Sequence, residues 1–138
     1  MNAAIATMTP KALAEIQAIE DYLFTLPEVH IQVTHTLHAG IYARTVHIPA
    51  GTATVGAFVK IPTVLTVSGD GALFVGDGCF EVEGFTILEG QAGRKQAFTA
   101  YTDCDVTMAF ATNAQTAEEA EREFTDDFER LQNRRIAA

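Results

Sequence analysis

The stretch from Thr63 to Leu88, TVLTVSGDGALFVGDGCFEVEGFTIL, alternates short β-rich runs with glycine-containing turns. Valine, isoleucine, phenylalanine and threonine favour extended backbone, and they recur in the runs at residues 63–68, 72–75, 79–82 and 85–88. Gly-Asp-Gly or Glu-Gly separates each run from the next, and glycine gives the backbone the freedom that hairpin turns need. This stretch therefore predicts a meander of short antiparallel strands.

The segments on both sides continue the β pattern. From Val29 to Ile48 the residues alternate with a period of two, which predicts two strands joined through His38-Ala39-Gly40. Residues 96–102 and 105–111 are two further apolar runs. The strands within about 29–112 are enough for a sandwich or small barrel, in which closure or sheet packing protects strand edges. We therefore predict an all-β fold.

A helix is predicted before the β region, at about 10–26. Thr9-Pro10 is typical of a helix start, with threonine as the N-cap and proline in the first turn. Pro27 ends the pattern, and between these points one apolar stripe recurs at helical spacing, through Leu13, Ile16, Ile19 and Leu23.

A second helix is predicted after the β region, at about 117–135. Thr116 and Glu119 form a capping box at its start. Thr125-Asp126-Asp127 resembles a second cap, so a break into two helices at that point is the alternative. The apolar stripes of both helices must be buried, either against the barrel or against a partner.

Composition and charge narrow the range of partners. The 138 residues are 48% hydrophobic and 20% charged, without repeat or linker, so we expect one domain over residues 1–138. A net charge of −9 repels phosphate backbones, and no basic cluster precedes Arg134-Arg135. The first residues lack the basic start of a signal peptide, and no apolar window of about 18 residues suggests a membrane span. We expect no nucleic-acid or membrane partner, and synthesis in a cytoplasm.

Cysteine chemistry is not expected. Cys79 and Cys104 are too far apart in sequence for a C-x-x-C motif, so we predict reduced core or strand residues. Asp103 and Asp105 flank Cys104, and their charges should raise the pKa of its thiol.

Polar residues in and near the strands are candidates for a ligand site at a barrel mouth, namely Tyr42, Arg44, His47, Lys60 and Tyr101. Arginine and tyrosine supply planar donors and stacking faces for an anion or a sugar. Alternation places Tyr42 and Arg44 on one face of a strand and His47 on the other, so Tyr42 and Arg44 are the candidate ligand-binding residues. The alternative is that Arg44 pairs with an acid and the tyrosines cover the edge of the core.

No metal site, cofactor or catalytic residue is predicted from the residues themselves. His35-x-x-His38 is a candidate pair of metal ligands, but no carboxylate lies near it at ligand spacing, which favours hydrogen bonding or a surface role. Ser68 is the only serine and lacks the G-x-S-x-G context of an activated nucleophile.

Residues 51–69 and 92–98 resemble the two signature motifs of the cupin family, G-x5-H-x-H-x3-4-E-x6-G and G-x5-P-x-G-x2-H. Counting from Gly69 and Gly93, the family's four metal ligands fall on Gly56, Phe58, Pro62 and Gln96. Glycine, phenylalanine and proline side chains offer no nitrogen or oxygen ligand. The resemblance implies a cupin-like antiparallel jelly-roll, commonly dimeric, in which the metal ligands are lost. Metal-dependent cupin chemistry is therefore not expected.

A narrower resemblance concerns small cupin-like proteins encoded by tailed phages. Residues 38–52, HAGIYARTVHIPAGT, look like the opening of these proteins, and residues 92–95 and 116–125 echo their later segments. An H-K-T-E-H cluster often fills the ligand segment of that branch, whereas this chain has VKIPT at residues 59–63.

These resemblances lead to two functional hypotheses. We expect a non-enzymatic structural protein of a tailed-phage virion, a capsid cement or decoration protein that acts as a homo-oligomer, with a dimer favoured, on the major capsid protein. The alternative is a metal-free cupin module that binds a sugar or a small anion at the barrel mouth, as a binding protein or a sugar-modifying enzyme.

Overall fold

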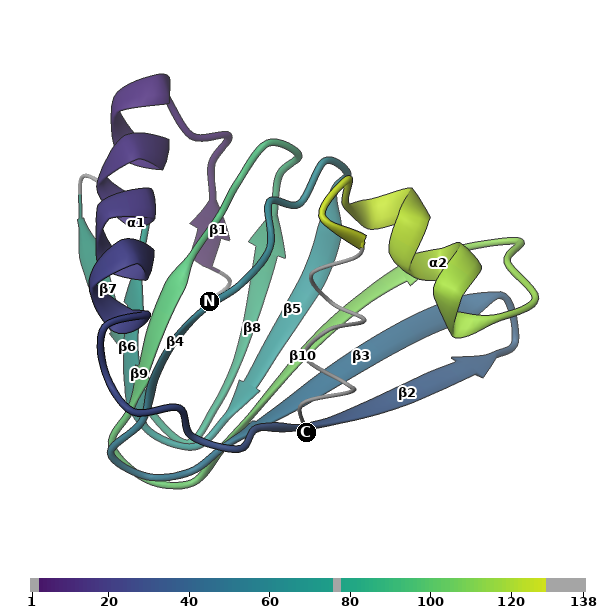
Figure 1. Cartoon of the computed structure of the whole chain (residues 1–138). Coiled ribbons are helices and arrows are strands. Elements are labelled where there is room, and N and C mark those ends of the chain that lie inside the picture. Colours follow the sequence, from purple (N-terminus) through teal and green to yellow (C-terminus); the bar gives the residue numbers. More distant parts are fainter. Residues whose placement is uncertain (1–2, 76–77, 129–138) are drawn as a thin grey trace.

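The computed structural model of the chain describes residues 3–75 and 78–128 (Figure 1). The elements in chain order are β1 (Ala3–Ile5), α1 (Pro10–Leu23), β2 (Gln32–His38), β3 (Ile41–Ile48), β4 (Ala53–Val55), β5 (Thr63–Ser68), β6 (Gly71–Phe74), β7 (Cys79–Val82), β8 (Phe85–Gly90), β9 (Ala97–Ala100), β10 (Cys104–Ala111) and α2 (Ala117–Phe124). The all-β fold with a helix on either side, predicted from the sequence, is confirmed.

The described strands form two sheets. The larger sheet has the order β1-β8-β5-β10-β3-β2, and the smaller sheet has the order β4-β9-β6-β7. All strand pairs are antiparallel except β1 with β8. Neighbours in each sheet often lie far apart in the sequence, so the predicted simple meander holds only for the β6–β7 hairpin within the smaller sheet.

The hairpin of β2 and β3 turns at the predicted position. Ala39 and Gly40 have φ values of 55° and 73°, the left-handed backbone of the tight turns that match the twist of paired strands. β2 begins at Gln32 rather than at Val29. Gln32 pairs with His47, and β3 ends one residue later at Ile48, so residues 29–31 have almost no partner strand. Pro49 follows, and proline has no N–H group to continue the ladder.

The core lies between the sheets and follows the period of two that the sequence shows. In β5, Leu65 and Val67 are buried while Val64 and Ser68 are exposed. In β3, Arg44 points inward and His47 lies on the outer face. The alternation along each strand thus decides which side chains reach the interior of the barrel.

Helix α1 covers the outer face of the smaller sheet (Figure 1). The side chain of Thr9 accepts a hydrogen bond from the backbone N–H of Ala12 at 3.1 Å, which confirms the predicted cap. Ile16 is fully buried in a cluster with Met8, Val55 and Ala97. A buried ion pair joins α1 to the segment just before β9, with 2.9 Å between Nζ of Lys95 and Oε1 of Glu20.

Helix α2 begins with the predicted cap and ends earlier than the predicted range. The hydroxyl of Thr116 accepts from the backbone N–H of Glu119 at 3.2 Å. After Phe124 the backbone of Thr125 is extended, with φ −148°, and its hydroxyl accepts from the N–H of Asp127 at 3.1 Å. The structure therefore has the alternative break at Thr125 in place of an uninterrupted helix. Residues 129–135 of the predicted range lie outside the described residues.

The apolar stripes of both described helices face the barrel. Ile16 of α1 and Phe124 of α2 are 0% and 2% exposed, so the first of the two alternatives for these stripes is correct. Within the part of the chain that the structure describes, neither helix combines the length and the apolar composition needed to cross a membrane.

Candidate ligand-binding site

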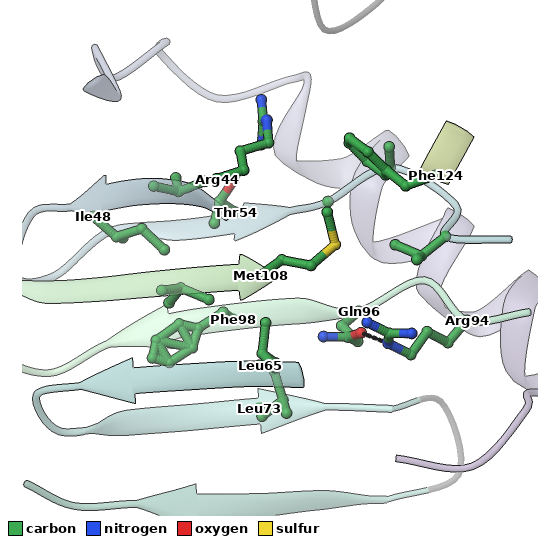
Figure 2. Close-up of a pocket in the computed structure, with 15 residues that line it drawn as sticks. Arg44, Ile48, Thr54, Leu65, Leu73, Arg94, Gln96, Phe98, Met108 and Phe124 are labelled. Carbon is green, nitrogen blue, oxygen red and sulfur yellow. Dashed lines mark hydrogen bonds between the residues drawn. The ribbon is translucent and has the colours of Figure 1, made fainter. Parts of the chain in front are cut away.

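Side chains of the two sheets line a partly open cavity of about 120 Å³ (Figure 2). Its wall is largely apolar and is made by inward side chains of both sheets, namely Ile48, Leu65, Leu73, Phe98, Val106 and Met108. An apolar cavity of about 150 Å³ is known to bind benzene, whereas drug-sized ligands occupy about 300–1,000 Å³. The cavity therefore suits a small and mainly apolar molecule.

Helix α2 borders the cavity through Phe124. The ring of Phe124 meets that of Phe110 edge to face, at 6.1 Å between centroids. The backbone N–H of Lys60 donates to the carbonyl oxygen of Phe124 at 2.8 Å, which ties the end of α2 to the segment before β5. This helix end is thus fixed in place beside the cavity.

Gln96, just before β9, supplies a polar group that faces the cavity. Nε of Arg94 donates to Oε1 of Gln96 at 2.7 Å. A guanidinium can only donate, so this bond fixes the amide oxygen toward Arg94 and turns the amide nitrogen away from it. Figure 2 shows the nitrogen on the far side of the amide from Arg94. Among the described residues no protein acceptor binds this nitrogen, so it can donate to a ligand.

Arg94 itself is a buried cation beside the cavity, with 1% of its surface exposed. Its guanidinium donates only to neutral acceptors, which are the amide of Gln96, the carbonyl oxygens of Gln91 at 2.6 Å and Ile61 at 3.4 Å, and the hydroxyl of Thr63. Within the described residues, no carboxylate forms an ion pair with it. Burial lowers the pKa of Arg94 to about 10, so the group still carries its charge at neutral pH.

Gly90 makes room for this guanidinium. A Cβ atom at Gly90 would collide with Cζ of Arg94 and would lie 2.7 Å from its Nε. With any larger residue at this position the guanidinium would have to move, because it lies directly against the backbone of β8.

Arg44 and Tyr42 lie on the inner face of β3 and make different contacts. Arg44 lines the cavity, and its Nε is 3.9 Å from Oε2 of the buried Glu121 on α2. The predicted alternative, in which Arg44 pairs with an acid, is confirmed. The hydroxyl of Tyr42 lies 2.7 Å from Nδ1 of His35, and its ring packs edge to face on Phe110. Ligand binding by Tyr42 or Arg44 stays a prediction.

The side chains present do not fit the metal centre that the cupin motifs imply. Of the four motif positions, Gly56 and Gln96 line the cavity, Phe58 does not, and Pro62 is exposed. His35 bonds to Tyr42, and His38 is exposed at the end of β2. The described residues contain no group of three or more histidine, cysteine, aspartate or glutamate side chains placed to hold a metal ion.

The other residues suggested for a barrel-mouth site lie elsewhere. His47 bonds to Asp105 on the outer face of the larger sheet, at 2.7 Å. Lys60 pairs with the exposed Asp126 at 2.8 Å. Tyr101 is exposed and donates to Glu81 at 3.0 Å, and this hydrogen bond raises its pKa. Arg44 alone of the five suggested residues lines the cavity.

Neither cysteine is part of the cavity lining. Cys79 is exposed and Cys104 is buried, and both are free. Burial is the main cause that raises the pKa of the Cys104 thiol, with smaller contributions from the charges of Asp70 and Asp105. The predicted direction of this pKa is therefore correct, but the flanking charges are not its main cause.

Comparison with known proteins supports the fold. No protein-family profile matches the sequence, and no curated protein matches it. Among solved structures, ectoine synthase from P. lautus has a TM-score of 0.51 and 19% identity, covering 72% of this chain and 76% of that chain. KdgF from Halomonas sp. has a TM-score of 0.52 and 15% identity, covering 64% and 84% respectively.

A cupin superfamily protein from Desulfitobacterium hafniense DCB-2 is a further match, with a TM-score of 0.51 and 9% identity, covering 64% of this chain and 83% of that chain. The chain therefore has the cupin jelly-roll fold, as the motif resemblance implied. At these identities the likeness establishes the fold alone.

The prediction that this chain is not an enzyme is contradicted by these matches. The same fold occurs in ectoine synthase, which is an enzyme by its name, so the fold does not exclude catalysis. None of the three matched structures is described as a phage protein, and the phage resemblance receives no support from them.

Proposed function

We propose that the protein is a metal-independent cupin that binds a small, mainly apolar organic molecule in its barrel cavity. The observation that carries this proposal is the amide of Gln96, which stands at a metal-ligand position of the family motif and lines the cavity. Its hydrogen bond to Arg94 presents a donor to the cavity in a fixed orientation. The amide would anchor the polar end of a ligand in the place where a metal ion serves other cupins.

The apolar wall favours a short apolar body over a sugar. A sugar in this cavity would bury hydroxyl groups against Leu65, Leu73 and Phe98, which offer no hydrogen bond. An unpaired buried hydroxyl costs about 1–3 kcal/mol. Of the two ligand classes in the sequence-based alternative, the sugar is therefore disfavoured.

Filling the cavity should abolish binding. We expect Val106→Phe, on the cavity side of β10, to remove the thermal stabilisation that short-chain acids, amides or alcohols give the unaltered protein, because bound ligand stabilises the native state. Thermal-shift screening with these compounds is the measurement. The matched control is Val64→Phe, because Val64 is 49% exposed on the outer face of β5.

Equal stabilisation of the Val106→Phe variant and the unaltered protein would show that the ligands bind elsewhere. An absence of saturable stabilisation by every compound class would contradict the proposal as well. Each variant's own melting temperature, measured without ligand, separates a loss of binding from a loss of folding.

The virion role remains a separate prediction. A cement or decoration protein would act as a homo-oligomer on the major capsid protein and would be found in virions. No contact within the described residues bears on it. Co-purification with intact particles in a copy number near that of the shell protein is the observation that would favour it.

A further inference from the structure

The charges around the cavity are opposite in sign to the charge of the whole protein. The chain carries a net charge of −9, yet the described cavity lining contains Arg44 and Arg94 and no acidic side chain. An acidic protein surface repels anions from solution. The cavity is therefore a more favourable place for an anion than the acidic surface around it.

The two arginines contribute unequally to this positive interior. The charge of Arg44 is offset by Glu121, 3.9 Å away. The charge of Arg94 is not offset by any carboxylate of the described residues, and its hydrogen-bond acceptors are neutral. Buried charges in proteins are usually paired, because an unpaired one costs much solvation energy. The end of the cavity at Gln96 and Arg94 is thus the place where a negative charge is most favourable.

We propose that the ligand is a small carboxylate, with its head on the amide nitrogen of Gln96 and its apolar body against the cavity wall. This inference rests on the proposed function and specifies its ligand class. The carboxylate would accept a hydrogen bond from the amide of Gln96. It would also lie close to Arg94 and supply the negative charge that the described residues do not give this guanidinium. Leu65, Leu73 and Phe98 would receive the rest of the molecule.

A carboxylate fits this site better than phosphate or sulfate. Those anions are polar on every side, whereas the polar groups here lie at one end of an apolar space. A carboxylate carries a single charge, which one guanidinium offsets, and it can be attached to an apolar body of about the size of benzene.

The test compares isobutyrate with its neutral isostere isobutyramide, because the two have nearly the same shape and differ in charge. Binding to the full chain is followed by NMR titration of the backbone amides of the cavity-lining residues in every variant, and also of the side-chain amide of Gln96 in the unaltered protein. We expect isobutyrate to bind with a Kd of about 1 mM. Its affinity should exceed that of isobutyramide by about tenfold, because hydrogen bonds to charged groups are stronger than those between neutral groups.

Gln96→Glu provides the second arm. Its carboxylate would stand 2.7 Å from Nε of Arg94, where the amide oxygen now stands, and would neutralise the buried charge from within the protein. We expect this variant to melt at an equal or higher temperature and to lose its affinity for isobutyrate by about tenfold or more. Gln96→Leu, the control, removes the donor without adding a charge and should retain part of the preference for the anion.

The outcomes separate this inference from the proposed function. If isobutyrate and isobutyramide bind equally well and Val106→Phe loses both, the ligand is not specifically a carboxylate, but the proposed function, binding of a small molecule in the cavity, still holds. An absence of binding by either compound would contradict both. The comparison on the unaltered protein remains decisive if a Gln96 variant fails to fold.

The pH dependence gives one more readout. Burial lowers the pKa of Arg94 to about 10, so its charge is constant between about pH 6 and 8.5. Isobutyrate affinity should therefore be flat across this range. A loss of affinity as the pH rises through about 6.5 would show that a protonated histidine, and not Arg94, supplies the positive charge that binds the anion.

Discussion

Lys95→Met should lower the free energy of unfolding by about 3–5 kcal/mol, the usual cost of breaking a buried ion pair from one side. Nζ of Lys95 lies 2.9 Å from Oε1 of Glu20 and 3.3 Å from Oε1 of Gln17, and the Lys95 and Glu20 side chains are 9% and 6% exposed. Methionine keeps the apolar stem but removes the cation that faces Glu20. Because Glu20 belongs to α1, the loss falls on the contact of this helix with the smaller sheet. Urea denaturation is the measurement.

Two further variants make this result specific. Lys60→Met is the same substitution in an exposed ion pair, in which Nζ of Lys60 lies 2.8 Å from Oδ1 of Asp126 and the Asp126 side chain is 85% exposed. It should lower the free energy of unfolding by less than about 1 kcal/mol. The double variant Lys95→Met with Glu20→Leu should recover most of the stability, because apolar groups of similar volume replace buried pairs at little cost. Equal losses in Lys95→Met and Lys60→Met would show that burial does not govern the energy of the pair.

The sequence predicts the strands well where pairing is local and the alternation is clear. β2 and β3 form a hairpin whose turn is marked by Gly40, and their period of two assigns Arg44 inward and His47 outward. The sequence does not predict β1 and β4, because each is only three residues long. Their pairing with β8 and β9 depends on partners distant in the sequence, which no local pattern reveals.

The candidate site was only partly predictable. Motif counting placed Gly56 and Gln96 at the ligand positions, and both do line the cavity. It could not show that the Gln96 amide is held by Arg94, because the burial of an arginine with neutral acceptors depends on the loops that enclose it. A glycine four residues before an arginine was the available signal, since Gly90 is the residue that gives the guanidinium its space. That spacing is too common to be read without coordinates.

Gly90→Ala should lower the free energy of unfolding by about 3 kcal/mol, because the Arg94 guanidinium would have to leave its position. The added Cβ would collide with Cζ of Arg94 and lie 2.7 Å from both Nε and Nη2. A displaced guanidinium would lose its hydrogen bonds to Gln91, Thr63 and Gln96, and charge-assisted bonds of this kind contribute about 1.5–3 kcal/mol each. The arginine is flexible, and some of these bonds would form again elsewhere, so the net loss is smaller than their sum.

Gly78→Ala is the matched control, because no atom lies within 4 Å of a Cβ built there, its φ is not in the left-handed region, and it does not line the cavity. It should change stability by less than about 1 kcal/mol. Displacement of Arg94 would also release the Gln96 amide, so Gly90→Ala should lose the preference for isobutyrate over isobutyramide even at temperatures where it remains folded. Stability and anion preference both unchanged in Gly90→Ala would mean that the position of this guanidinium governs neither the fold nor the site. Loss of both properties would show that Gly90 determines the stability of the fold and the anion preference of the site. Both depend on Arg94, whose charge selects the ligand and whose hydrogen bonds join the loops.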